Sequence, residues 1–266
     1  MKSFTKIKSL IVLINVSLLL FSSLLTAKKH QVILPGKPLA NAVNVKPYTG
    51  EWKQLVLKEG SWLSSGIIRE ELTTLDGEHW QHIQSQRQQR DGKAQASVTR
   101  KLRKSDLFTL HMKQKLPGVV KGSPKSVTAT YGDHKIQREI VTHDDQVKTQ
   151  QVELPFDGFD GFIFGLALAG LPLEEGKLFR IPSVMASFMN GYWVDVNVSD
   201  GGVVVVKGKS RPVWFVDVSW LNIHDGDTYL PGPDASGGRY TIFKQQPKGL
   251  PAVYRYKTDT LDIILE

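Results

Sequence analysis

The sequence predicts a mainly β protein, folded as an antiparallel curved sheet or open β-barrel with a short apolar plug helix around residues 158–171. Three observations predict this fold class. Apolar and polar side chains alternate along many segments, as they do on half-buried strands. Turns containing Asp and Gly separate these segments. One run in the middle of the chain is apolar on all sides, which requires burial.

The N-terminal residues 1–27 have the pattern of a secretory signal peptide. Three lysines precede an apolar run that ends near Leu25, and Ala27 supplies the small residue of a cleavage site. An uncleaved anchor helix is the alternative, because the run is long enough to span a membrane. The sequence has no cysteine, which excludes a lipid-modified cysteine and any disulfide. We therefore expect a periplasmic protein that is exported by a signal peptide and is not lipidated.

The rest of the chain has the length of one β-rich domain. Removing residues 1–27 leaves about 239 residues and lowers the formal net charge from +8 to +5, because three lysines and no acids are lost. Residues 28–46 are proline-containing and aperiodic, which predicts a flexible N-terminal segment. A single β-rich domain is expected over 47–266. A mildly basic exported protein is expected to meet anionic lipid or polysaccharide, and no nucleic acid.

Strand periodicity is clearest in the C-terminal half. In the segment YWVDVNV, Tyr192 and the valines that follow at every second position share one face. In VWFVDVSW, Trp214 and Trp220 lie on the same face as the valines between them. Hairpin turns are predicted at Asp76-Gly77, Asp91-Gly92, Gly132-Asp133 and Asp200-Gly201-Gly202. This spacing predicts a meander of long antiparallel strands.

The apolar run GFDGFIFGLALAGLPL predicts a buried helix. Asp157 or Asp160 is available as N-cap, and Pro172 ends the run. A helix of about 14 residues is about 21 Å long and falls short of the roughly 30 Å hydrocarbon core, so it is not expected to span a membrane. The interior is either a solid core or a cavity that admits an acyl chain. If it is a cavity, the candidate ligand-binding side chains are Phe162, Phe164, Leu168, Trp193, Trp214 and Trp220.

Motifs for catalysis and metal binding are absent from the sequence. Gly208-Lys209-Ser210 lacks the earlier glycine of a phosphate-binding loop. His79 and His82 are three residues apart on a predicted strand, so they are expected on opposite faces as solvated side chains rather than metal ligands. The segments His143 to Asp145 and His224 to Asp227 have turn composition. We expect no catalytic residue, no metal and no cofactor.

A basic stretch defines a candidate patch for an anionic partner. Its members are Arg87, Arg90, Arg100 and Lys104, on and around the segment RKLRK. The alternative interpretation is that these residues form the solvated outer face of an exposed sheet.

Four further segments carry a resemblance to a known family. They are GIIREEL, LALAGLPLEEGKLFRIP, GYWVDVNV and GGRYTIFKQQPKGLPAVYRY. From about Trp62 to the C-terminus the chain resembles the bacterial exported proteins of domain of unknown function family 3108. The resemblance implies a periplasmic curved antiparallel sheet closed by short helices, similar to periplasmic lipoprotein carriers. It implies no catalytic residues.

Three functions are consistent with these patterns. The first is a non-enzymatic periplasmic binding or carrier protein for a lipid or other apolar ligand, with a role in cell-envelope biogenesis. The second is a periplasmic scaffold or assembly factor that binds envelope proteins through exposed sheet edges. The third is an envelope-polymer hydrolase that would bring the His143 and His224 segments into one cleft. The sequence leaves the oligomeric state open.

Overall fold

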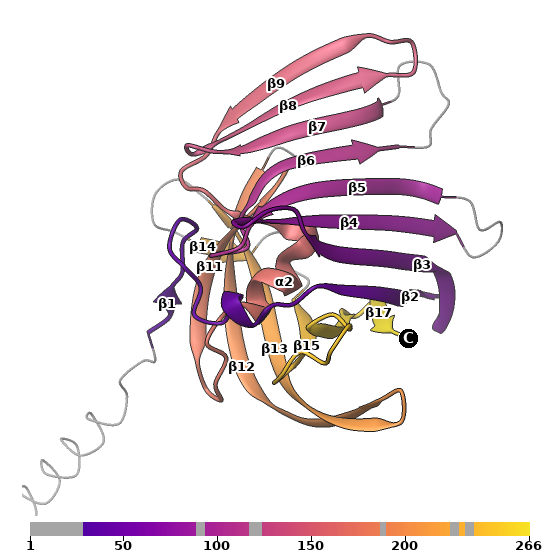
Figure 1. Ribbon diagram of the computed structural model, residues 1–266, viewed down its shortest axis with the longest axis vertical. Coiled ribbons are helices and arrows are strands. Elements are labelled where there is room, and N and C mark those ends of the chain that lie inside the picture. The colour runs from indigo at the N-terminus through magenta and orange to yellow at the C-terminus, as the bar shows by residue number, and fades with distance from the viewer. Residues whose placement is uncertain (1–28, 89–93, 117–123, 187–189, 224–228, 232–236) are drawn as a thin grey trace, which may run out of the picture. The chain divides into compact units, whose positions relative to one another are not determined.

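The computed structural model describes residues 29–88, 94–116, 124–186, 190–223, 229–231 and 237–266 (Figure 1). The predicted signal peptide, Arg90 and the Asp91-Gly92 turn lie outside the described residues. Gln31–Glu266 form one compact unit.

Most of the described chain forms one large sheet, which confirms the predicted fold class. The strands are β1 (Gln31–Val32), β2 (Tyr48–Lys58), β3 (Ser61–Thr74), β4 (His79–Gln88), β5 (Ala94–Arg103), β6 (Thr109–Lys115), β7 (Pro124–Gly132), β8 (Lys135–Thr142), β9 (Val147–Glu153), β10 (Phe159–Asp160), β11 (Leu178–Met185), β12 (Asn190–Val206), β13 (Lys209–Ile223), β14 (Tyr229–Pro231), β15 (Gly238–Phe243), β16 (Val253–Lys257) and β17 (Leu261–Leu265).

Strands β11 to β17 and β2 to β9 follow one another across the sheet with antiparallel pairing. The C-terminal strand β17 pairs with β2 and so joins the two halves. The short strands β1 and β10 both pair in parallel with the other edge of β11. The order is that of a meander, as the turn spacing predicts.

The sheet curves until β11 packs against β5 to β7. Val184 and Ala186, at the end of β11, belong to the same buried cluster as Val98, Met112 and Tyr131 of β5 to β7. These strands are far apart in the strand order. This contact gives the sheet the form of an incomplete barrel. Figure 1 shows α2 within the curve of the sheet. We call the face that carries Val98 and Met112 the concave face.

The predicted alternation is confirmed on β12 and β13. Val194, Val196 and Val198 are fully buried, as are Val216 and Val218 on the neighbouring strand. The predicted turn at Asp200-Gly201-Gly202 is wrong, because β12 continues through it with a bulge between Asp200 and Val203. The hairpin instead turns at Lys207-Gly208, where both residues have positive φ. A β-bulge can require a glycine with positive φ, as a tight turn does, so the same Asp-Gly-Gly sequence is compatible with either structure.

The plug helix is shorter than the expected 158–171. It consists of the 3-10 turn η2 (Gly161–Ile163) and the helix α2 (Phe164–Ala169). The preceding residues are extended, because β10 pairs with Ser183 and Val184 of β11. A Cβ atom at Gly158 would lie 2.7 Å from a Val184 methyl carbon, so a glycine is needed for this close approach. Asp160 caps η2 by accepting a hydrogen bond from Phe162 N at 3.0 Å.

The sequence predicts a flexible N-terminal segment over 28–46, but from Gln31 onward this segment lies against the domain, beginning with the pairing of β1 with β11. Leu39 N donates to Ser105 O and Asn41 N donates to Gly170 O, each at 2.9 Å. The side chains of Leu39, Ala42 and Val45 are buried in the main core. The apolar residues of this aperiodic stretch are therefore explained by packing around the 3-10 turn η1 (Ala42–Asn44).

Candidate functional site

Four of the six predicted interior side chains belong to the main core or lie against it. Phe164 and Leu168 of α2 are 1% and 0% exposed. Trp214 and Trp220 of β13 are partly buried against the same core. The rings of Phe164 and Trp220 are 5.3 Å apart. These side chains fill space between the helix and the sheet, so most of the interior is solid.

The other two predicted interior side chains lie elsewhere. Trp193 is on the opposite face of β12 from the buried Val194, and its ring is 4.6 Å from that of Phe156. The alternation of a strand requires this placement, so the prediction of Trp193 as an interior residue is wrong. Phe162 of η2 is 51% exposed and lies at the edge of a hollow.

This hollow opens on the concave face beside η2. It has two adjoining parts, of about 310 and 120 Å³. Phe162, Ile68, Gln84 and Ile263 line both parts. Apolar and amide side chains alternate in the larger part, whose lining includes Gln54, Gln84, Gln86 and Gln114 together with Ile68, Val98, Met112, Phe162 and Ile263. Its volume is at the lower end of the range for small-molecule sites.

The strand register explains this lining. Val98 of β5 pairs with Gln84 of β4 on one side and with Gln114 of β6 on the other. Cross-strand partners share a face, so the amides flank the valine. Gln86 Nε2 also donates to Gln54 Oε1 at 2.8 Å. The hollow therefore offers neutral donors and acceptors beside apolar surface.

A buried polar group lies next to the smaller part of the hollow. Tyr48 Oη donates to Glu70 Oε1 at 2.6 Å, and His82 Nε2 lies 2.5 Å from the same oxygen. The His82 side chain is fully buried, so the expectation of a solvated histidine is wrong. Burial raises the pKa of Glu70, but attraction to His82, hydrogen bonds from His82 and Tyr48, and the charge of Arg100 together hold that pKa below its usual value.

Arg100 occupies the wall of the larger part. Its Nε donates to Asp160 Oδ2 at 2.8 Å, and both side chains are almost completely buried. The Arg100 Nη1 atom is also buried and has no hydrogen-bond partner among the described residues. Tyr131 lies beside Asp160, and burial followed by the charge of Asp160 raises the pKa of the Tyr131 phenol. The ion pair ties β5 to β10 across the barrel.

The predicted basic patch is not formed. Arg100 is buried, because its position on β5 faces the concave side. Lys104 donates to the carbonyl of Asp76 at 2.6 Å and lies 4.6 Å from the Trp80 ring centroid. Arg87 is exposed but lies at the other end of the β4–β5 ladder, roughly 25 Å away by strand rise. The three described members, Arg87, Arg100 and Lys104, therefore do not share a surface.

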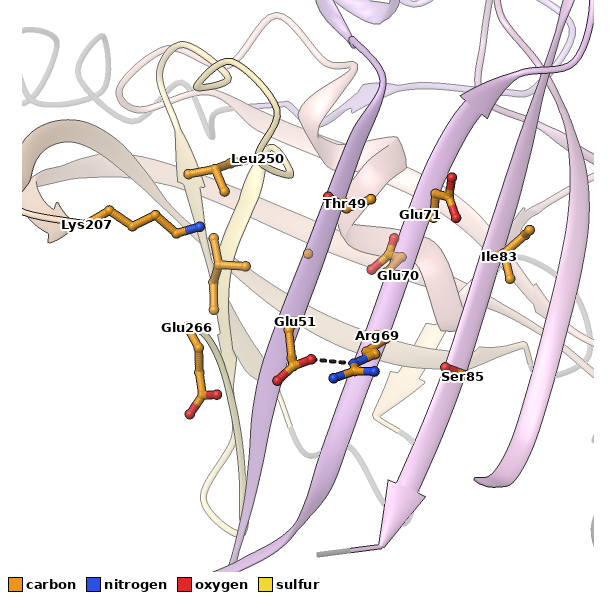
Figure 2. A pocket seen from close by; sticks show the side chains of 12 residues that line it. Thr49, Glu51, Arg69, Glu70, Glu71, Ile83, Ser85, Lys207, Leu250 and Glu266 are labelled. Atoms are coloured by element: carbon orange, nitrogen blue, oxygen red, sulfur yellow. Dashed lines mark hydrogen bonds and ion pairs between the residues drawn. The ribbon is translucent and has the colours of Figure 1, made fainter. Parts of the chain in front are cut away.

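Two of the larger hollows elsewhere have several charged side chains in their lining. Figure 2 shows one of them, of about 490 Å³, where Glu51 and Arg69 form an ion pair and Lys207 extends toward the groove from the β12–β13 hairpin. Arg239 and Asp217 form a similar exposed pair in another. Exposed ion pairs of this kind contribute little to binding or stability. The concave hollow differs because apolar side chains and amides make up most of the lining of its larger part, with Arg100 as the charged residue there.

The hydrolase hypothesis depends on the segments His143 to Asp145 and His224 to Asp227. His143 to Asp145 form the turn between β8 and β9, where Asp145 pairs with Lys125 at 3.0 Å. The segment His224 to Asp227 lies outside the described residues. Within the described ranges, no group of three or more His, Asp or Glu side chains is placed to hold a metal ion. No helix in the described chain combines the length and apolar character needed to cross a membrane.

Replacing Glu70 by Gln tests the buried polar group. Because the pKa of Glu70 is lowered by folding, its charge stabilises the fold above the unfolded pKa of about 4.3, and this stabilisation is lost as the pH falls through the folded pKa. We expect Glu70→Gln to lower the unfolding free energy by about 1–3 kcal/mol at neutral pH and by less near pH 3. Urea denaturation at both pH values measures this.

The matched control is Glu71→Gln, because Glu71 is exposed on the opposite face of β3. This control is expected to change stability by less than about 0.5 kcal/mol at either pH. Equal effects of the two variants would contradict the role given to Glu70.

The fold is that of an open, β-barrel-like protein with a hollow on its concave face. No protein-family model matches the chain, and no curated protein matches it. Among solved structures, the chain is similar to a β-barrel-like protein of domain of unknown function family 1849 from Brucella abortus. The TM-score is 0.48 at 14% sequence identity, covering 84% of this chain and 97% of that one. The resemblance to family 3108 stays a prediction.

Proposed function

We propose that the protein is a non-enzymatic periplasmic binding or carrier protein that holds a lipid or another apolar ligand in the concave hollow. The observation that carries the proposal is the lining of the hollow. Aliphatic side chains and amides stand side by side there, next to the buried donor of Arg100. Surface of this kind suits a ligand with an apolar chain and a few hydrogen-bonding atoms.

The position of η2 and α2 supports this proposal. The helix is fixed in the core by Phe164 and Leu168, whereas Phe162 projects half-exposed over the hollow. A ligand can therefore bind beside the plug without displacing it. Export by the predicted signal peptide and membership of family 3108 would place this binding in the cell envelope.

Native mass spectrometry of the protein purified from its natural host under mild conditions tests the proposal. We expect a mass above that of the polypeptide by one lipid-like species, and a rise in melting temperature when lipids are added to protein stripped of that species. A bare polypeptide mass together with no thermal shift from any lipid would contradict it.

A scaffold role is the second candidate, and the edge strand β9 favours it. Among the described residues β9 pairs with β8 alone, and most of its side chains are exposed. An unpaired edge can add a strand from a partner protein. If the lipid tests fail, crosslinking from Lys148 in β9 to envelope proteins in intact cells becomes the decisive experiment. Crosslinks concentrated at other surfaces would count against an edge-mediated role.

A further inference from the structure

A carboxylate in the smaller part of the concave hollow points to the head group of the ligand, provided that the proposed binding function holds. Glu70 is the charged residue in the lining of this part. On β3 it lies between Ile68 and Leu72, which pack in the core, so its side chain faces inward. The Glu70 side chain keeps 14% of its surface accessible. A group that enters the smaller part can therefore reach it.

One oxygen of this carboxylate is open to a further hydrogen bond. Oε1 of Glu70 accepts from Tyr48 Oη and lies 2.5 Å from His82 Nε2. Oε2 accepts no hydrogen bond among the described residues, and it is not completely buried. An ionised carboxylate has room for about four hydrogen bonds. Oε2 can therefore accept one from an N–H group of a ligand.

The neighbours of Glu70 do not balance its charge. Arg100 is ion-paired with Asp160 at 2.8 Å, so that pair is neutral. His82 Nδ1 is buried and has no hydrogen-bond partner among the described residues. Protonation of His82 would leave an unpaired N–H group there, so a neutral ring that donates from Nε2 fits this environment better. Two carboxylates and one guanidinium then give a net charge of about −1, which a bound cation would balance.

Aromatic side chains line the same part of the hollow as the carboxylate. They are Tyr48, Trp52, Phe162, Tyr240 and Tyr256. Gly50 pairs with Glu70 across β2 and β3, and a Cβ atom at Gly50 would lie 2.6 Å from Cη2 of Trp52. The absence of a side chain at Gly50 thus makes room for the indole ring at the strand position next to Glu70. Aromatic rings attract cations and exclude water, and both effects strengthen a contact between an ammonium group and a carboxylate.

We propose that the concave hollow binds an amphiphile with a protonated primary amino group, which donates a hydrogen bond to Glu70 Oε2. The smaller part, of about 120 Å³, has room for the head group but not for a long chain. The chain lies in the larger part, of about 310 Å³, and passes Ile68 and Ile263, which line both parts. The ligand class is therefore an alkylamine or an amino-bearing lipid rather than a neutral ester or a free fatty acid.

Calorimetric titration with three probes of equal chain length tests this head-group assignment. They are decylammonium, monodecanoin and decanoate, each used at neutral pH below its critical micelle concentration. We expect decylammonium to bind at least about tenfold more tightly than monodecanoin, and decanoate to bind most weakly because Glu70 repels it. Monodecanoin or decanoate binding as tightly as decylammonium would overturn the assignment and leave the proposed function standing. No binding of any probe would overturn both.

Two matched variants test the role of Glu70. Glu70→Gln keeps the size of the side chain and removes its charge, so it is expected to weaken decylammonium binding by about tenfold and to change monodecanoin binding by less than about twofold. Glu71→Gln changes an exposed carboxylate on the opposite face of β3 and should leave the binding of both probes unchanged. Equal losses of decylammonium binding in the two variants would overturn the assignment to Glu70. The comparison of probes on the unaltered protein stands even if Glu70→Gln fails to fold.

Discussion

Replacing Asp160 by Asn is expected to lower the unfolding free energy by about 3–5 kcal/mol, because it leaves the buried charge of Arg100 without its partner. Both side chains of the pair are at most 1% exposed, so water cannot compensate. Domains of this kind are stable by about 5–15 kcal/mol in total, so the loss is large. Urea denaturation of the variant and the wild type measures it.

Two further variants serve as a control and as a rescue for this prediction. Asp217→Asn breaks the exposed pair with Arg239 and should cost less than about 1 kcal/mol. The double variant Arg100→Met, Asp160→Asn removes both charges and should recover most of the loss. A cost for Asp160→Asn as small as that for Asp217→Asn would show that the cross-barrel pair is not formed in solution.

Replacing Phe164 by Ala is expected to cost about 3–5 kcal/mol, because it empties a fully enclosed space between α2 and the sheet. Phe162, two residues earlier, provides a matched control. It is 51% exposed, so Phe162→Ala should cost less than about 1 kcal/mol of stability while weakening ligand binding. Thermal and urea unfolding of the two variants compare them directly.

The comparison of Phe164→Ala with Phe162→Ala shows whether α2 is a fixed part of the core or a segment that can move away from it. If the two phenylalanine variants lose similar stability, or if Phe164→Ala loses almost none, then α2 is not the fixed core element described above. Tryptophan fluorescence offers a second readout, since Phe164 packs on Trp220 and the ring contact would be lost.

Periodicity predicted the sheet well, because alternation directly reports which side chains are buried. The same rule places Glu70 inward between Ile68 and Leu72 in GIIREEL, and Trp193 outward beside Val194, so both positions were readable from the sequence. Arg100 was misassigned because a basic residue is usually exposed. Its partner Asp160 is 60 residues away in the chain, and no local pattern indicates such a pair.

The ends of the elements were harder to predict. The apolar run of 158–171 does not show that its first residues pair with β11, because that contact is nonlocal. Gly201 and Gly202 mark a bulge rather than a turn, and the two uses of glycine look alike in sequence. The hollow is a product of the curvature of the whole sheet, so its volume could not be predicted from any segment.

Methyl NMR during titration with monodecanoin tests the central claim most directly. The claim predicts shift changes for the methyl groups that line the hollow, those of Ile68, Val98, Met112 and Ile263, with Val194 and Val216 of the solid core unchanged. Saturable shifts confined to the first set would support binding on the concave face. Shifts confined to the outer face, at Ile83 or Val205, or no shifts at all, would contradict it.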